Sequence, residues 1–290
     1  MRAFRWMPPG KSYGRFEGID YLLLRMNIEQ RPRTLPKSLV AALQKTPMRY
    51  AKAGTTNASM TVASYNVHKC VGVDNVFDPE RVATVIGEID ADIVALQEAD
   101  ERFGRRAGLL DLHRLQRETN LVPVEPPRYS NGHGWHGNVL LVRDGVIRNV
   151  EHLKLPGVEP RGALVVDIER KGVEFRVIAA HLGLLRHSRA LQAAHLLEHA
   201  IAANRPTILL GDLNEWRVGR RSSLETLLPD FGPLEAAIPS FPSRFPLLAL
   251  DRILASPHDL IASIETHDTP TARMASDHLP LKARVELAPS

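Results

Sequence analysis

The segment TILLGDLNEW, residues 207–216, joins a run of apolar residues directly to the polar sequence Gly-Asp-Leu-Asn. Its first residues have the length and composition of a buried β-strand. Side chains alternate along an extended chain, so Asp212 and Asn214 face the same side. The segment therefore predicts a buried strand that ends in a carboxylate and an amide. Taken alone, GDLN is also typical of a type I turn, in which Asp and Asn bond to their own backbone.

Polar residues follow several other apolar strands in the same way. The sequences are ASYNVH with Asn66 and His68, IVALQE with Gln97 and Glu98, VIAAHL with His181, LALDRIL with Asp251, and ASDHLP with Asp277 and His278. Each has its own structural explanation, such as a bonded core histidine, a turn, or an ion pair of Asp251 with Arg252. Their joint occurrence favours convergence on one site, because strand ends hold polar groups rigidly and leave them accessible.

The strands and helices around these segments predict an α/β fold. Amphipathic helices are expected at residues 78–89, where Asp78 precedes Pro79, at 109–120, and at 188–203, which begins with a Ser cap. Hairpins are expected with turns at Asp144-Gly145 and Lys171-Gly172. This order fits two mixed, largely antiparallel sheets packed face to face, with helices on both outer faces.

Composition indicates an ordinary soluble domain. The chain has 290 residues, 44% hydrophobic and 24% charged, which is usual for a globular protein. Its apolar runs are shorter than the roughly 18 residues that span a bilayer, and no apolar leader segment is evident. Cys70 is the single cysteine, so an intrachain disulfide is excluded. We expect a soluble, cytoplasmic protein without stable membrane insertion.

The positive charge is concentrated at one end of the chain. Residues 1–60 carry 11 Lys and Arg against 3 Asp and Glu, whereas the remainder carries 26 against 30. We expect residues 1–59 to form a basic, poorly ordered extension with one short helix near 36–44, and residues 60–290 to form the catalytic domain. A basic arm can bind polyanions or anionic membranes, but a solvated tail or upstream sequence is the simpler explanation. The oligomeric state stays open.

The polar set suits a hard divalent cation. Carboxylate and amide oxygens are typical ligands of Mg²⁺ or Mn²⁺, which keep some waters and share a substrate phosphate. A thiolate cage is excluded by the single cysteine, and His195 and His199 lack the glutamate of a HExxH site. The absence of GxxxxGK[ST] and GxSxG motifs disfavours a nucleotide-driven motor and a serine hydrolase. Arg161 is either a phosphate ligand or a surface residue at the start of a strand.

A specific combination of short motifs spans about Met60 to Leu287. In order, these are YNVH, LQE, GNVLL, RGAL, AHLGL, GDLN, LDRIL and SDH. With these motifs the sequence resembles the endonuclease/exonuclease/phosphatase superfamily, which has the deoxyribonuclease-I-like fold. Within it, the sequence is most similar to uncharacterised bacterial members. The resemblance implies a four-layer α/β/β/α sandwich and Mg²⁺- or Mn²⁺-dependent hydrolysis of a phosphate ester.

The resemblance also implies a role for each motif residue. Asp212 would orient or deprotonate the attacking water, and His278, oriented by Asp251, would contact the scissile phosphate. His181 would stabilise the phosphate or protonate the leaving group. The remaining assignments are metal binding by Asn66, Glu98 and Asp277, and phosphate binding by Asn138, Arg161 and Asn214, with Asn214 also positioning Asp212.

The substrate is open between nucleic acid and a phospholipid or small phosphate. A nuclease should carry basic grooves with stacking aromatics, for which residues 101–108 and Arg128-Tyr129 are candidates. A phospholipid phosphodiesterase or phosphatase should expose apolar loop tips, for which GWHG (134–137) and SFPSRFPLL (240–248) are candidates. A catalytically inactive phosphate-binding module is disfavoured, because GDLN, QE and SDH are all intact.

Overall fold

The computed structural model describes residues 48–49, 59–101, 107–124, 132–228, 230–234 and 236–287. All of these belong to one compact unit, Lys37–Ser290. The short helix expected near residues 36–44 and most of the expected N-terminal extension lie outside the described residues. So do residues 102–106 and Arg128-Tyr129, which the sequence offered as parts of a nucleic-acid groove.

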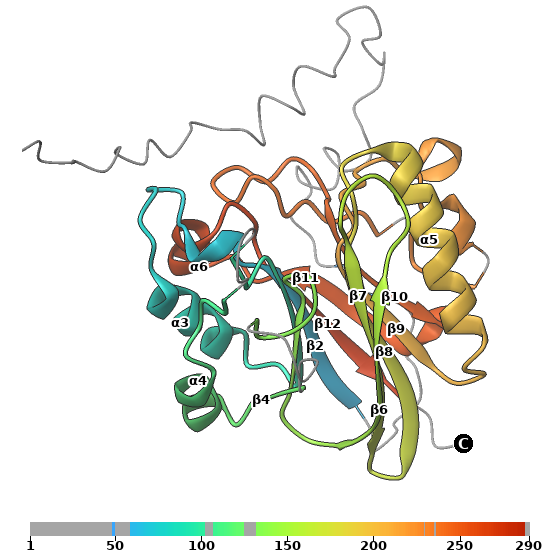
Figure 1. The fold of residues 1–290 in the computed structure, drawn as a ribbon, viewed down its shortest axis with the longest axis horizontal. Coiled ribbons are helices and arrows are strands. Elements are labelled where there is room, and N and C mark those ends of the chain that lie inside the picture. The colour runs from blue at the N-terminus through green and yellow to red at the C-terminus, as the bar shows by residue number, and fades with distance from the viewer. Residues whose placement is uncertain are drawn as a thin grey trace, which may run out of the picture. The chain divides into compact units, whose positions relative to one another are not determined.

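Two mixed sheets form the centre of the fold (Figure 1). The seven-stranded sheet has the order β1 (Met48–Arg49), β11 (Ile261–Thr266), β12 (Leu281–Glu286), β2 (Ser59–Asn66), β3 (Ile93–Gln97), β5 (Val139–Val142) and β4 (Val122–Pro123). The five-stranded sheet has the order β10 (Asp251–Ser256), β9 (Thr207–Asp212), β8 (Val173–His181), β7 (Gly162–Arg170) and β6 (Val146–Lys154). The pairs β2–β3 and β8–β9 are parallel, and the other described pairs are antiparallel.

Helices cover the outer face of each sheet (Figure 1). On the side of the seven-stranded sheet lie α3 (Pro79–Ile89), α4 (Leu112–Thr119) and α6 (Pro270–Ala275), and on the side of the five-stranded sheet lies α5 (Arg186–Ile201). Short 3₁₀ helices lie in the connections: η1 (His68–Cys70), η2 (Gly219–Arg221), η3 (Glu225–Leu227) and η4 (His258–Leu260). The four-layer α/β/β/α architecture expected from the sequence is confirmed.

Three apolar layers hold the four structural layers together. The layer between the sheets combines residues of both, including Ile93, Leu164 and Phe175. A second layer lies between the seven-stranded sheet and its helices, and a third lies under α5. In β3, Ile93 faces the inner layer and Val94 the outer one. Burial on both faces explains why such strands are continuous apolar runs rather than alternating ones.

The helix signals in the sequence hold for α3. The Asp78 carboxylate accepts a hydrogen bond from the backbone N–H of Arg81 at 3.0 Å, and Pro79 occupies the first helical position. Val82, Val85 and Ile86 point from α3 into the outer apolar layer. The spacing of these residues buries one stripe of the helix and leaves the rest to solvent.

Three local expectations are wrong or incomplete. The turn at Asp144-Gly145 does not join a hairpin, because β5 and β6 belong to different sheets; a local turn signal does not determine which sheet receives the next strand. Helix α5 begins at Arg186 without a side-chain cap, so Ser188 is not the N-cap. Helix α6 was not assigned from the sequence, although Thr269 caps it and Pro270 begins it.

Strand directions bring the motif residues to one edge. The parallel pairs β2–β3 and β8–β9 end at Asn66, Gln97, His181 and Asp212. Strand β10 is antiparallel to β9 and begins at Asp251, directly opposite Asp212. Strand β7 begins at Gly162, directly after Arg161, beside the end of β8. None of the helices within the described residues is long and apolar enough to cross a membrane.

Candidate active site

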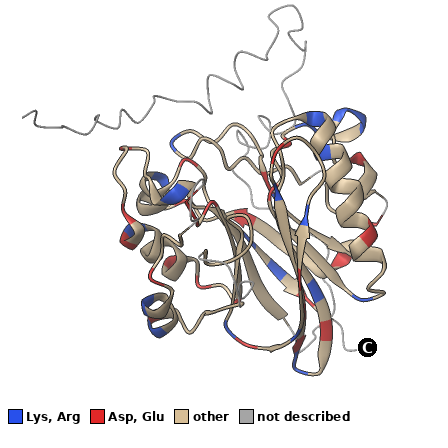
Figure 2. Ribbon diagram, in the orientation of Figure 1, with Lys and Arg blue, Asp and Glu red and all other residues tan. Residues whose placement is uncertain are grey.

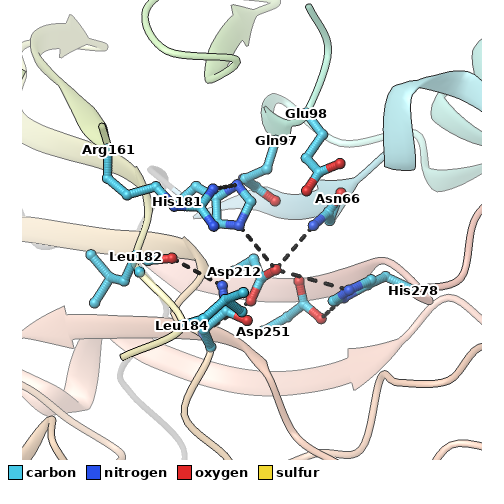
Figure 3. A network of polar contacts seen from close by, with 12 residues as sticks. Asn66, Gln97, Glu98, Arg161, His181, Leu182, Leu184, Asp212, Asp251 and His278 are labelled. Atoms are coloured by element: carbon cyan, nitrogen blue, oxygen red, sulfur yellow. Dashed lines mark hydrogen bonds and ion pairs between the residues drawn. The ribbon is translucent and has the colours of Figure 1, made fainter. Parts of the chain in front are cut away.

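Asp212 lies at the centre of the polar network at this edge (Figure 3). Its side chain is 3% exposed. Oδ2 accepts a hydrogen bond from Asn66 Nδ2 at 2.9 Å, and Oδ1 accepts one from the backbone N–H of Asn214 at 3.0 Å. One residue from the opposite sheet and one from the following turn thereby fix both carboxylate oxygens.

Local backbone requirements explain the sequence GDLN. At Gly211, φ is +151° and a Cβ would lie 1.8 Å from the carbonyl oxygen of Ala180, so β8 approaches too closely for a side chain. Asn214 has φ of 52°, the left-handed region that Asn tolerates best after Gly. Its Nδ2 donates to the carbonyl oxygen of Leu182 at 2.9 Å. Asn214 therefore positions Asp212 through its backbone while its side chain anchors the turn.

His278 and Asp251 form a buried pair beside Asp212. His278 Nδ1 lies 2.8 Å from Asp251 Oδ2, which also accepts a hydrogen bond from Ser240 Oγ. The other ring nitrogen, Nε2, lies 3.9 Å from Asp212 Oδ2. Burial alone would lower the pKa of His278, but the charge and hydrogen bond of Asp251, with the charge of Asp212, raise it to about 10. Asp251 therefore holds the ring protonated and oriented.

His181 approaches Asp212 from the other side. Its Nε2 lies 3.5 Å from Asp212 Oδ2, and its Nδ1 lies 3.1 Å from Arg161 Nη1. A guanidinium only donates, so Nδ1 accepts and Nε2 carries the proton. Burial and the charge of Arg161 hold the pKa of His181 well below its usual value. The two histidines therefore differ in charge: His181 is neutral and His278 is cationic.

Asp212 itself has a shifted pKa. Burial raises the pKa of Asp212 to about 6, against the opposing effect of the His278 charge. The carboxylate is therefore ionised at neutral pH but much more basic than an exposed aspartate. Such a group can accept a proton from a bound water near neutral pH.

Glu98 lies beside Asn66 at the end of β3 (Figure 3). Its φ is 55°, and η1 contains three more left-handed residues, His68, Lys69 and Cys70, with φ of 45°, 54° and 57°. Such residues each cost about 1 kcal/mol or more and cluster at functional sites. Hydrogen bonds secure this turn: the N–H of His68 donates to Asn66 Oδ1 at 3.0 Å, and the N–H of Lys69 donates to the Glu98 carbonyl at 3.2 Å.

This turn brings the Lys69 ammonium into an ion pair with the Glu98 carboxylate. Lys69 Nζ lies 2.6 Å from Glu98 Oε2, and both side chains are partly exposed. Burial would raise the pKa of Glu98, but the charge and the hydrogen bond of Lys69 oppose it, and that pKa lies far below its usual value. Glu98 is therefore an ionised carboxylate that already attracts one cation.

The donor set of the predicted metal ligands fits Mg²⁺ or Mn²⁺. Glu98 and Asp277 supply partly exposed carboxylates. Asn66 donates through its amide nitrogen to Asp212, and its carbonyl oxygen accepts one hydrogen bond from His68, which leaves a second lone pair. Within the described residues, no group of three or more His, Cys, Asp and Glu side chains is arranged to hold a metal by itself. Few protein oxygens suit a cation that keeps its waters.

Asn138 lies next to this site but is engaged elsewhere. It is fully buried, and its Nδ2 donates to the carbonyl oxygens of Trp135 and Gly162, each at 3.0 Å. These bonds join the turn before β5 to the start of β7. Its predicted phosphate contact stays a prediction, since both amide hydrogens already have backbone partners.

Two contributors were not found from the sequence. Lys69 directly follows His68 in YNVHK, so a basic residue after a strand end was a visible but unspecific signal. Ser240 bonds to Asp251 and carries no pattern that identifies it. Gln97, by contrast, was a strand-end candidate, but its side chain is buried against Ser64 and the Ala95 carbonyl.

The layers and the polar edge define a protein of the deoxyribonuclease-I-like fold. The chain belongs to the endonuclease/exonuclease/phosphatase family, whose model matches residues 63–278. It is 29% identical to the uncharacterised protein YbhP of Escherichia coli K12, over 80% of this chain and 98% of YbhP. The resemblance to this family, which the sequence motifs indicated, is thereby confirmed.

Solved structures show the same fold. An endonuclease/exonuclease/phosphatase from Beutenbergia cavernae superposes with a TM-score of 0.61 at 22% identity, covering 79% of this chain and 72% of that one. TDP2 of D. rerio, complexed with a single-strand DNA product, superposes with a TM-score of 0.61 at 15% identity, covering 80% of this chain and 100% of that one. At these identities the likeness establishes the fold alone.

Proposed function

We propose that this protein is a divalent-metal-dependent phosphoesterase that hydrolyses its substrate by in-line attack of water. The observation that carries the proposal is the surrounding of one buried carboxylate. Asp212 Oδ2 lies within 3.9 Å of groups from Asn66, His181 and His278, which come from three different strand ends or loops. Water would add across the P–O bond, with its oxygen going to phosphorus and a proton to the leaving oxygen.

Each polar residue has a role that its contacts support. Asp212 accepts the proton of the attacking water, and Asn66 and the Asn214 backbone orient its carboxylate. His278, cationic and held by Asp251, stabilises negative charge on the phosphate. His181 carries its proton on Nε2, on the side of Asp212, where it can donate to a phosphate or leaving oxygen.

Glu98, Asn66 and Asp277 are the residues that would hold the metal. A divalent cation, when bound, would neutralise charge on the phosphate oxygens. Arg161, half-buried beside His181, would supply a further positive charge to the phosphate. These assignments rest on the chemistry of the side chains and their positions at one edge.

The fold does not determine which phosphate ester is the substrate. A nuclease is one candidate, supported by the single-strand DNA product bound to D. rerio TDP2. A phospholipid or small-phosphate esterase is the other. We propose residues 60–290 as the catalytic domain, with residues 1–59 as an extension. A cytoplasmic location stays a prediction from the single cysteine.

A substrate panel tests the proposal. Purified full-length protein is incubated with Mg²⁺ or Mn²⁺ and plasmid, single-stranded DNA, RNA, sphingomyelin, phosphatidylinositol phosphates and bis-p-nitrophenyl phosphate. We expect turnover of at least one phosphate ester, and its loss in EDTA. Metal binding without turnover of any panel member would favour the inactive binding module instead.

A further inference from the structure

Four of the loops that leave the two sheets at the edge that carries Asp212 expose large apolar side chains. Their strands end or begin at Asn66, Gly162, His181 and Asp251. We call these loops the site rim, which comprises residues 67–78, 155–161, 182–185 and 241–250. Because every one of them continues from a strand end of the polar network, the site rim borders the candidate active site.

The site rim exposes large apolar side chains. The exposed fractions are 55% for Phe77, 82% for Val158, 43% for Leu184 and 70% for Phe245. A single exposed apolar residue is ordinary on any protein surface. Here, however, each of the four loops presents one at the same edge of the fold, which calls for a common explanation.

The two apolar segments singled out in the sequence behave differently. In GWHG, Trp135 packs against the layer between the sheets, and its Nε1 donates to the Leu153 carbonyl at 2.7 Å, so it is not an exposed tip. In SFPSRFPLL, Phe241 is buried but Phe245 is exposed. Phe245 is therefore the apolar tip that this segment offers.

Hydrogen bonds join the loops that carry the apolar tips in pairs. Arg244 Nη2 donates to the Val73 carbonyl at 3.2 Å, which ties the loop of Phe245 to the loop of Phe77. On the other side of the site, the N–H of Leu184 donates to Glu159 Oε2 at 2.7 Å, which ties its loop to that of Val158. The apolar tips are thus presented by a bonded frame that reduces the entropy cost of docking.

Exposed arginines accompany the apolar tips. Arg244 precedes Phe245, Arg186 lies two residues after Leu184, and η2 contributes Arg220 and Arg221. None of the four forms an ion pair within the part of the chain that the structure describes. Figure 2 shows Lys and Arg at the upper end of α5 and in the adjoining loop. Each such cation near an anionic bilayer contributes about 1 kcal/mol.

Aliphatic tips distinguish the candidate partners. A nucleic-acid site would combine arginines with aromatic rings on which bases stack. Phe77 and Phe245 carry such rings, but Val158 and Leu184, on the other side of the site, are aliphatic. Apolar side chains that enter the acyl boundary, flanked by arginines that contact headgroups, are typical of proteins that bind at a membrane surface. The combination on the site rim therefore favours a lipid surface over a nucleic acid.

We propose that the site rim docks on the surface of an anionic phospholipid bilayer, so that the site takes its phosphoester from a lipid headgroup. This inference rests on the phosphoesterase function proposed above. Docking would bring headgroup phosphates to the edge where Asp212, His181 and His278 lie. It requires no segment that spans the membrane.

Vesicle binding by the full-length protein tests the docking. Wild type, Val158→Ser and Phe245→Ser are compared by flotation with phosphatidylcholine vesicles and with phosphatidylcholine–phosphatidylglycerol vesicles, at low and high salt. High salt suppresses binding through the basic N-terminal residues but spares apolar insertion. We expect wild type to bind the mixed vesicles, and each substitution to weaken binding about tenfold.

A matched control and a second ligand complete the test. Val146 is 51% exposed but lies at the opposite end of β6, so Val146→Ser should bind vesicles like wild type. Wild-type vesicle binding by Val158→Ser and Phe245→Ser would overturn the proposal. So would loss of single-stranded DNA binding, measured by fluorescence anisotropy, without loss of vesicle binding.

Hydrolysis of soluble bis-p-nitrophenyl phosphate separates the two proposals. We expect all of these variants to retain the wild-type rate on it, because the substituted side chains lie outside the polar network. If the wild-type protein hydrolyses the soluble ester but does not bind vesicles, the docking proposal is overturned and the phosphoesterase proposal is retained. Vesicle docking without hydrolysis of any ester would count against the phosphoesterase function.

Discussion

His278 connects Asp251 to Asp212, with Nδ1 at 2.8 Å from the first carboxylate and Nε2 at 3.9 Å from the second. The strand pairing makes this possible, because Asp251 and Asp212 lie directly opposite each other in β10 and β9. A cationic ring between two carboxylates is held in one orientation and one protonation state. The pair therefore positions charge for a phosphate at the same edge.

Asp251→Asn tests the positioning of His278. The substitution keeps the shape but removes the negative charge that holds the ring, so we expect the hydrolysis rate to fall by about 10²-fold. Circular dichroism and urea unfolding check that the variant is folded. Asp259→Asn, an exposed change in η4, is the matched control and should keep the wild-type rate. Wild-type activity in Asp251→Asn would exclude this role.

Lys69→Met tests whether an ammonium and a metal compete for Glu98. Lys69 Nζ must withdraw from its position 2.6 Å from Glu98 Oε2 before a cation can bind that oxygen. Removing the competing charge should tighten Mn²⁺ binding by about tenfold, measured by calorimetry. Lys282→Met, which removes a similar contact to Glu265, should leave the affinity unchanged. Weaker Mn²⁺ binding in Lys69→Met would contradict competition.

Gly211→Ala tests why glycine precedes Asp212. The added Cβ would meet the Ala180 carbonyl oxygen at 1.8 Å, so β8 and β9 must separate next to His181 and Asp212. We expect a loss of about 2 kcal/mol or more in the free energy of unfolding, together with lower activity. Gly87→Ala in α3 meets nothing within 4 Å and should instead stabilise the protein by about 1 kcal/mol. Equal effects of the two substitutions would refute the steric account.

Glu215 gives a prediction of pH dependence. The buried Glu215 carboxylate accepts hydrogen bonds from Ser223 and Arg217 and pairs with Arg189. Burial would raise its pKa, but the hydrogen bonds from Ser223 and the other donors outweigh burial and lower it. A lowered pKa stabilises the folded state above the unfolded value of about 4.3, and this contribution is lost as pH falls through the folded value.

The difference between wild type and Glu215→Gln measures that contribution. At neutral pH we expect the substitution to cost about 3 kcal/mol in urea unfolding, because Arg189 loses its buried partner. As the pH falls below about 4.3 the difference should shrink. The exposed Glu225→Gln is the control, with little effect at either pH. If the stability difference between wild type and Glu215→Gln instead grows toward acid pH, the pKa of Glu215 is not lowered in the folded protein, and this prediction is contradicted.

The sequence predicts the strand-end residues of the site better than the links between them. Asp212, His181 and Asp251 follow from apolar runs with polar ends, because strand length and burial leave a strong local pattern. The pairing of β5 with β3 rather than with β6 cannot be predicted from such a local pattern, because it depends on packing between the sheets. Contacts such as Ser240 with Asp251 depend on loop paths that no local pattern encodes.

Lys69 shows the same limit within the site. Its contact with Glu98 depends on successive left-handed residues in η1, which the side chains His, Lys and Cys do not signal. The cap of α3 lies within a few residues of its helix and was predicted correctly. Local signals therefore locate the elements, whereas tertiary contacts decide which neighbour each polar group meets.

The most direct test of the account compares wild type with Asp212→Asn on the panel substrate that is turned over fastest, in Mg²⁺ or Mn²⁺. The change keeps the volume of the side chain but removes the base that Asn66, His181 and His278 surround. We predict a rate lower by about 10³-fold or more in a variant whose fold is unchanged, as checked by circular dichroism. A folded Asp212→Asn variant that hydrolyses the substrate at the wild-type rate would contradict the account.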